Sequence, residues 1–155
     1  MSANETPNSR EYPKRPIVGV GGVVIEDGRA LLIRRGSEPL KGQWSIPGGT
    51  LETGETLLEG VVREMAEETG LQVRVLELIE VFERIMRDAE GRARYHFVIV
   101  DYLCENAGGT AEAASDVTHI AWAREEELES YKLTPTATRI LKKAFAMDRA
   151  RRSAD

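Results

Sequence analysis

The feature that most constrains the fold is a helix whose start and end are both visible in the sequence. Thr56 and Glu59 have the T-x-x-E spacing of a capping box, in which each side chain binds a free backbone amide at a helix N-terminus. Gly70 suits the left-handed conformation that ends many helices. Between these points, apolar residues recur on one side at helical spacing: Leu58, Val61, Val62, Met65 and Ala66. We therefore expect a helix over residues 56–70 that packs one side on a hydrophobic core.

The other side of this helix is acidic. At about 100° of rotation per residue, Glu64, Glu67 and Glu68 fall within one arc. Like charges at this spacing repel by about 0.2–0.5 kcal/mol per pair, and the helix dipole disfavours negative charge near the C-terminus. Two interpretations remain open, a solvated helix face and a set of carboxylates that ligates a hard divalent cation. Gly60, one turn before Glu64, either leaves room for a ligand or allows a close contact with a strand.

A tight loop precedes the helix, and the two together match a known motif. Residues 47–49, proline followed by two glycines, predict a turn in which the backbone can approach a ligand. Gly49 is followed by five residues and Glu55, and then by seven residues and the run from Arg63 to Leu71. This pattern resembles the Nudix box, G-x5-E-x7-R-E-U-x-E-E-x-G-U with U an aliphatic residue, at every specified position. On this resemblance the chain is identified as a member of the MutT-like Nudix hydrolase family.

The resemblance implies a fold and a metal site. The fold is of the α/β class, an α/β/α sandwich with a mixed central β-sheet. In Nudix hydrolases the acids of the box hold Mg²⁺ or Mn²⁺ together with a loop carbonyl, and the corresponding residues here are Glu64, Glu67, Glu68 and Gly48. Arg63 corresponds to the arginine that orients the neighbouring glutamate, and Glu55 to an acid that supports the loop or the metal.

The resemblance leaves the general base open. Some members take it from the box, where Glu64 would serve, and others from a distal loop. The distal loop corresponds here to residues 108–116, which are rich in glycine and alanine. Its candidate bases are Glu112 and Asp116, and the alternative for each is an ordinary solvated side chain.

Candidate substrate contacts lie outside the acidic stripe. Arg34 and Arg35 end an expected strand just before the loop, and with Gly49 they are the candidates for binding the substrate's phosphates. The alternative for the two arginines is a solvated strand end. Some aromatic side chains either stack on a base or ribose or belong to the core; these are Trp44, Phe82 and Tyr95.

The expected reaction is metal-dependent hydrolysis of the pyrophosphate bond in a nucleoside diphosphate linked to another group. The segments 94–98 and 115–117 resemble the short bacterial ADP-ribose pyrophosphatases, so ADP-ribose is the expected substrate. Residues 86–88 lack the proline and the tyrosine that mark some Nudix subfamilies. The alternatives are a pyrophosphohydrolase of (d)NTPs, including oxidised ones, and a nucleotide-sensing module that binds without turnover.

Composition narrows the class of protein. The net charge of −5 argues against binding to a nucleic acid polymer, because such proteins carry a basic footprint. Cys104 is the only cysteine, which excludes an intrachain disulfide or a cysteine zinc cluster. Residues 1–16 are polar and the apolar runs have the length of strands, so we expect a cytoplasmic protein that does not contact the membrane. The family resemblance also implies a homodimer.

The remaining elements follow from hydrophobic patterning. A flexible tail over residues 1–15 is expected to precede one Nudix domain over residues 16–149, and residues 150–155 form a C-terminal tail. Strands are expected at 17–26, 30–34, 73–85, 95–104 and 120–122. The first two are joined by a hairpin turn at residues 26–28. A short helix is expected at 125–131 and a longer one at 134–149.

Overall fold

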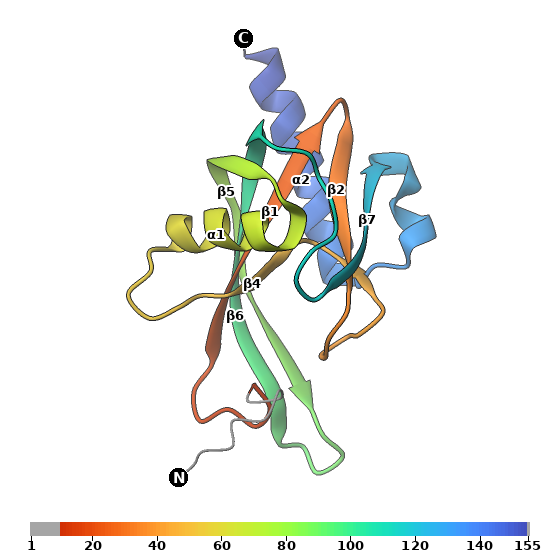
Figure 1. Ribbon diagram of the computed structural model, residues 1–155. Helices are drawn as coiled ribbons and strands as arrows, with labels where there is room; N and C mark the ends of the chain where they lie inside the picture. The colour runs from red at the N-terminus through yellow and green to blue at the C-terminus, as the bar shows by residue number, and fades with distance from the viewer. Residues whose placement is uncertain (1–9, 155) are drawn as a thin grey trace.

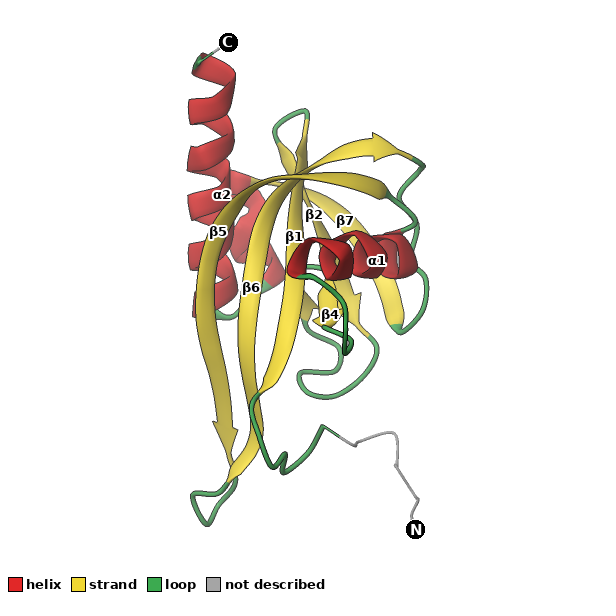
Figure 2. Cartoon of the chain, turned by 90° about the vertical axis from the view of Figure 1, so that its left-hand side faces the viewer, coloured by secondary structure: helices red, strands yellow, loops and turns green. Residues whose placement is uncertain are grey.

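A computed structural model describes residues 10–154 of the chain. Its centre is a mixed sheet, and the helices α1 (Leu57–Thr69) and α2 (Pro135–Ser153) lie on opposite sides of it (Figures 1 and 2). The strands are β1 (Ile17–Glu26), β2 (Arg29–Arg35), β3 (Trp44–Ser45), β4 (Gly48–Thr50), β5 (Gln72–Arg87), β6 (Ala93–Gly108) and β7 (Val117–Arg124), and a 3-10 helix η1 spans Glu125–Tyr131. The expected α/β/α sandwich with a mixed sheet is confirmed.

Strand β1 lies at the centre of the sheet. It pairs in parallel with β6 and antiparallel with β2 and β4. Strand β5 is antiparallel to β6 at one edge, and β3 and β7 both pair with β2. Because β1 is covered on both faces, its sequence is an almost unbroken apolar run, as a central strand requires.

The two faces of β1 contribute to two different cores. Val20 and Val24 pack with Val61 and Met65 of α1 on one face. Val23 and Ile25, on the other face, join the buried residues of α2, which are Ile140, Leu141, Ala144 and Phe145. This alternation is the period of two of a strand. As a result, α1 and the Gly48–Thr50 strand that precedes it are held against the centre of the sheet.

Several local expectations are confirmed and some are extended. The turn between β1 and β2 has positive φ at both Asp27 (51°) and Gly28 (74°), which is the type I′ geometry that suits a hairpin. The short strands β3 and β4 were not expected from sequence, since each is too short to show the alternation of apolar and polar residues that marks a strand. Helix α2 runs to Ser153, beyond the expected end at Arg149.

The expected flexible N-terminal tail lies partly outside the described residues, which exclude residues 1–9. In the described part, Tyr12 donates its backbone amide to the carbonyl of Arg94 (2.7 Å) and its hydroxyl to Asp88 (3.0 Å). Residues near Tyr12 are therefore held against the hairpin formed by β5 and β6. No helix within residues 10–154 combines the length and the apolarity needed to cross a membrane.

Candidate active site

Helix α1 begins and ends where the sequence indicates. The Thr56 hydroxyl accepts from the Glu59 amide (3.1 Å), and the Glu59 carboxylate accepts from the Thr56 amide (2.9 Å). This is the expected capping box. Gly70 ends the helix with φ 75°. Both ends of the helix are thus determined locally, which sets the rotation of its acidic stripe relative to the sheet.

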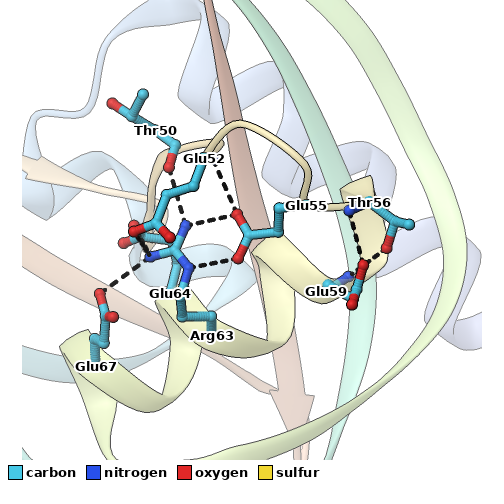
Figure 3. Close-up of polar contacts among 8 residues, drawn as sticks. All are labelled: Thr50, Glu52, Glu55, Thr56, Glu59, Arg63, Glu64 and Glu67. Atoms are coloured by element: carbon cyan, nitrogen blue, oxygen red, sulfur yellow. Dashed lines mark hydrogen bonds and ion pairs between the residues drawn. The ribbon is translucent and has the colours of Figure 1, made fainter.

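Arg63 joins the helix to the loop before it (Figure 3). Its guanidinium donates two hydrogen bonds to Glu55 (2.6 and 2.9 Å) and one to the carbonyl of Thr50 (3.0 Å). It also donates to Glu64 (2.7 Å) and Glu67 (3.2 Å). The hydrogen bonds from Arg63 lower the pKa of Glu55 to about 2, so that this carboxylate stays charged. Arg63 therefore orients Glu64 and fixes the loop at the same time.

The three acids of the stripe differ in exposure. The side chain of Glu67 is 50% exposed, that of Glu64 is 12% exposed, and Glu68 as a whole residue is 7% exposed. Burial raises the pKa of Glu64, and it raises the pKa of Glu68 to about 8. A solvated helix face therefore describes Glu67 alone, because the loop at β4 covers the other two carboxyl groups.

The glycines of the loop allow this covering. The Gly48 amide donates to the Glu68 carboxylate (3.0 Å). A Cβ atom at Gly49 would overlap the carboxylate of Glu64, and one at Gly48 would overlap the backbone of Val20. The loop can therefore lie on the acids only if both positions lack a side chain.

Gly60 serves packing and leaves no room for a ligand. A Cβ atom there would lie 2.7 Å from Cδ1 of Leu51 and 3.3 Å from a methyl carbon of Val20. Of the two interpretations offered by the sequence, close packing is the one observed. The nearest atoms belong to the loop, Leu51 and then Oε1 of Glu55 (3.1 Å), and Val20 of β1 follows. The helix approaches β1 closely at this point, which brings Glu64 and Glu68 toward the loop.

The residues around Gly48 fit a hard divalent cation. Glu64 and Glu68 are two desolvated carboxylates beside a glycine backbone, and oxygen donors of this kind suit Mg²⁺ or Mn²⁺. A cation would also offset the cost that burial imposes on both charges. Within residues 10–154, however, no group of three acid, histidine or cysteine side chains converges as a metal site. The carboxylates are instead held by Arg63 and the Gly48 amide, and Glu67 lies on the outer side of the stripe.

A cleft of about 670 Å³, open to solvent, adjoins the loop at Gly48 and Gly49. Arg35 lines this cleft and donates from Nε to the carbonyl of Pro39 (2.6 Å). Arg34 is not among the residues that line it, and its Nε donates to the carbonyl of Gly42 (3.0 Å). A register shift in the pairing with β7 lies between the two arginines. Arg35 and Gly49 therefore adjoin the cleft as candidate substrate contacts, whereas Arg34 does not.

The distal loop after β6 closes over the end of α1. The Glu112 amide donates to the carbonyl of Thr69 (2.9 Å), and the amide of Ala114 donates to the carbonyl of Glu68 (3.1 Å). Asp116 accepts from the Ser37 hydroxyl (2.7 Å), and its charge contributes to the raised pKa of Glu68. Both candidate bases are exposed.

Several residues that line the cleft were missed by the sequence reasoning. Asp101 on β6, Arg84 on β5 and Phe97 on β6 all line it. Asp101 could have been found from the sequence, because an aspartate inside an apolar strand is expected to be a buried charge, and buried charges often have a function. Arg84 and Phe97 had none, since a single arginine or phenylalanine in a strand is common.

The raised pKa of Glu68 leads to a prediction for the metal-free protein. A carboxyl group whose pKa is raised by folding keeps its proton in the folded chain after the unfolded chain has lost it. The stability contributed by this group therefore falls as the pH rises from about 4.5 to about 8. We expect the thermal midpoint in EDTA to fall less over this range in Glu68→Gln than in the wild type. If the thermal midpoint changed equally with pH in the two proteins, Glu68 would not be the group responsible. Asp101, whose pKa is raised to about 7, is present in both proteins, so its effect cancels when the two pH dependences are compared.

Comparison with known proteins agrees with this geometry. The family model described as NUDIX domain matches residues 14–144. An ADP-ribose pyrophosphatase of Methanocaldococcus jannaschii is 40% identical over 101 residues, which are 65% of this chain and 57% of that protein. The chain thus spans little more than half the length of this relative. A MutT-like protein of Streptomyces ambofaciens is 36% identical over 136 residues, covering 87% of this chain and 81% of that protein.

Solved structures show the same architecture. A MutT NUDIX hydrolase from Burkholderia pseudomallei superposes with a TM-score of 0.74 at 29% identity, over 84% of this chain and 98% of that chain. The NUDIX domain of Shewanella oneidensis NrtR, in complex with ADP ribose, superposes with a TM-score of 0.70 over 95% of this chain and 94% of that chain. Its identity of 23% supports likeness of fold alone.

Proposed function

Because this chain belongs to the Nudix family, we propose that it hydrolyses the pyrophosphate bond of a nucleoside diphosphate derivative, with ADP-ribose as the best candidate substrate. The observation that carries the proposal is the pair of buried carboxylates, Glu64 and Glu68, held against the loop at Gly48 and Gly49 beside an open cleft. The archaeal relative named as an ADP-ribose pyrophosphatase supports the choice of substrate.

The proposed roles combine the resemblance to the Nudix box with the positions of the side chains. Glu64, Glu67 and Glu68, with Gly48, would hold Mg²⁺ or Mn²⁺. Such a cation would offset the negative charge of the diphosphate and make an attacking water more acidic. Arg35 adjoins the cleft with a guanidinium that can bind a phosphate group. Arg63 keeps Glu64 in place through the hydrogen bond between them.

We propose Glu64 as the group that accepts the proton of the attacking water. Burial raises its pKa above the usual value of a glutamate, and a carboxylate with a higher pKa is a stronger base. Asp116 is the alternative, because its charge acts on Glu68 across the distal loop. Glu112 is a weaker candidate, since its Cγ atom would be 3.8 Å from a Cβ atom at Gly70, at the end of the helix. A loss of activity in Asp116→Asn as large as that in Glu64→Gln would favour the distal loop.

A substrate panel tests the proposed activity. With Mg²⁺ or Mn²⁺ present, we expect ADP-ribose to yield AMP and ribose 5-phosphate, since hydrolysis of the diphosphate leaves one phosphate on each product. The (d)NTP alternative predicts a nucleoside monophosphate and pyrophosphate. The sensing alternative predicts binding of ADP-ribose, NADH, FAD or (d)NTPs without any cleavage. Products identified by chromatography separate the three outcomes, and a homodimer is tested in parallel by the mass of the protein in solution.

A further inference from the structure

Asp101 and Arg84 are opposite charges that line the cleft and attract each other, yet within the described residues neither side chain has a hydrogen bond. Asp101 on β6 is only 3% exposed. Within residues 10–154 its carboxyl group has no side-chain hydrogen bond and no ion pair, and the same holds for the guanidinium of half-buried Arg84 on β5. A buried carboxyl group without a hydrogen-bond partner is costly and rare in folded proteins. The cost shows in its pKa, which burial raises to about 7. A ligand that forms a hydrogen bond with this carboxyl group would offset the cost.

The sheet places Asp101 at a defined position relative to the acidic loop. Asp101 pairs with Gly21 of β1, and Gly21 pairs with Gly48 of β4. Adjacent strands lie about 4.8 Å apart, so the Cα atom of Asp101 is about 10 Å from that of Gly48 across the sheet. The carboxylate itself lies over Gly21 on the side of the Pro47 carbonyl, since a Cβ atom at Gly21 would overlap Oδ1 of Asp101 and lie 3.0 Å from that carbonyl. The glycine therefore makes the space in which this carboxyl group faces the cleft.

The walls next to Asp101 suit a flat ring. Phe82 and Phe97 line the cleft together with Ile99. The ring of Phe97 is stacked on that of Tyr95, with centroids 6.3 Å apart, which stiffens this wall. A sugar would lose hydration against such apolar surfaces. A nucleobase would instead pack its apolar faces on them and direct its polar edge toward Asp101. Asp101 accepts hydrogen bonds and Arg84 donates them, and the polar edge of a base carries both kinds of group.

We propose that Asp101 is a specificity-determining residue that accepts a hydrogen bond from an N–H group on the base of the nucleotide, while Arg84 donates to an acceptor on the same edge. The inference rests on the proposed function only in taking the base to belong to a nucleoside diphosphate derivative. With the diphosphate at the loop of Gly48 and Gly49, the base extends across β1 to Asp101. Adenine, whose one N–H donor on this edge is its amino group, gives the simplest test.

The test compares ADP-ribose with the analogue in which hydrogen replaces the adenine amino group. We expect the wild type to prefer ADP-ribose in kcat/KM by about tenfold to a hundredfold, because the analogue leaves the buried carboxyl group unsatisfied. In Asp101→Ala this preference disappears, mainly through KM for ADP-ribose. In Asp101→Asn, which keeps one acceptor oxygen, part of it returns. Glu83→Gln, on the exposed face of β5, keeps the wild-type preference.

Two further measurements separate the failure of this inference from that of the proposed activity. Calorimetry of AMP and of its analogue without the amino group should show the same preference in binding, whether or not the protein cleaves ADP-ribose. The thermal midpoint of Asp101→Asn should stay close to that of the wild type, because this variant keeps the size of the side chain and removes a charge that burial disfavours, while the attraction to Arg84 is lost. An unchanged preference in Asp101→Ala would overturn the inference. A second contradicting result would be a change in Asp101→Ala of the kcat/KM ratio between ADP-ribose and ADP-glucose while the preference for the adenine amino group stays intact. Asp101 would then contact the sugar.

Discussion

Replacing Glu68 with glutamine is expected to lower kcat for pyrophosphate hydrolysis about a thousandfold, on the order of 4 kcal/mol in the barrier. Glu68 is buried beside the Gly48 amide and supplies one of two desolvated carboxylates that face the loop. Glutamine keeps the size and one acceptor oxygen of the side chain but loses the negative charge that a divalent cation needs. The fold should stay intact, since a neutral side chain is favoured at a position where burial raises the pKa to about 8.

The control for this experiment lies on the same helix. Glu59 is an exposed glutamate in the capping box, and glutamine at that position can still bind the Thr56 amide. Glu59→Gln should therefore keep the activity and the thermal midpoint of the wild type. Rates are measured over a range of Mg²⁺ and Mn²⁺ concentrations, so that weaker metal binding and slower chemistry are distinguished. Activity of Glu68→Gln close to that of the wild type at all metal concentrations would remove Glu68 from the site.

Replacing Arg63 with lysine is expected to lower kcat about tenfold to a hundredfold and also to lower the thermal midpoint. The guanidinium holds Glu55 with two hydrogen bonds and binds the Thr50 carbonyl and Glu64 with others, and an ammonium group cannot reproduce this planar arrangement. The loop would then be free to move from the helix, and Glu64 would lose its orientation. Both losses have one cause, so they should appear together.

The pH dependence gives this second prediction an independent readout. The pKa of Glu55 is lowered in the folded protein, so the stability from its pair with Arg63 is present above pH 4.5 and is lost as the pH falls toward about 2. The acid-induced loss should be smaller in Arg63→Lys than in the wild type. Arg74→Lys is the matched control, because Arg74 is exposed on β5 and, among residues 10–154, pairs with Glu105 alone. Normal activity and acid stability in Arg63→Lys would show that the network is dispensable.

Local signals in the sequence were sufficient for helix α1, for the hairpin at Asp27-Gly28 and for the composition of the acidic stripe. Each depends on residues close together in the chain, such as the capping pair Thr56 and Glu59 or the φ preference of Gly70. Arg63 and Glu67 are also close enough along one helix to meet. The likeness to the Nudix box is of the same kind, a run of residues at set spacings.

Other features depend on contacts between distant segments. The sequence does not distinguish a solvated Glu67 from a buried Glu68, because the difference arises from the loop at β4, which pairs with β1 and covers one side of the helix. Likewise, Arg34 and Arg35 are adjacent on one strand, so their side chains point to opposite faces of the sheet, and the position of the cleft decides that Arg35 is the one beside it.

The amino-acid sequence by itself determined that this protein carries a capped acidic helix behind a glycine loop, and hence its family, because those properties arise from neighbours along the chain. Only the tertiary structure decided which acids are desolvated and that Asp101 and Arg84 line the same cleft. The physical reason is that burial and charge environment are set by pairing across β4, β1, β6 and β5, whose residues lie far apart in sequence.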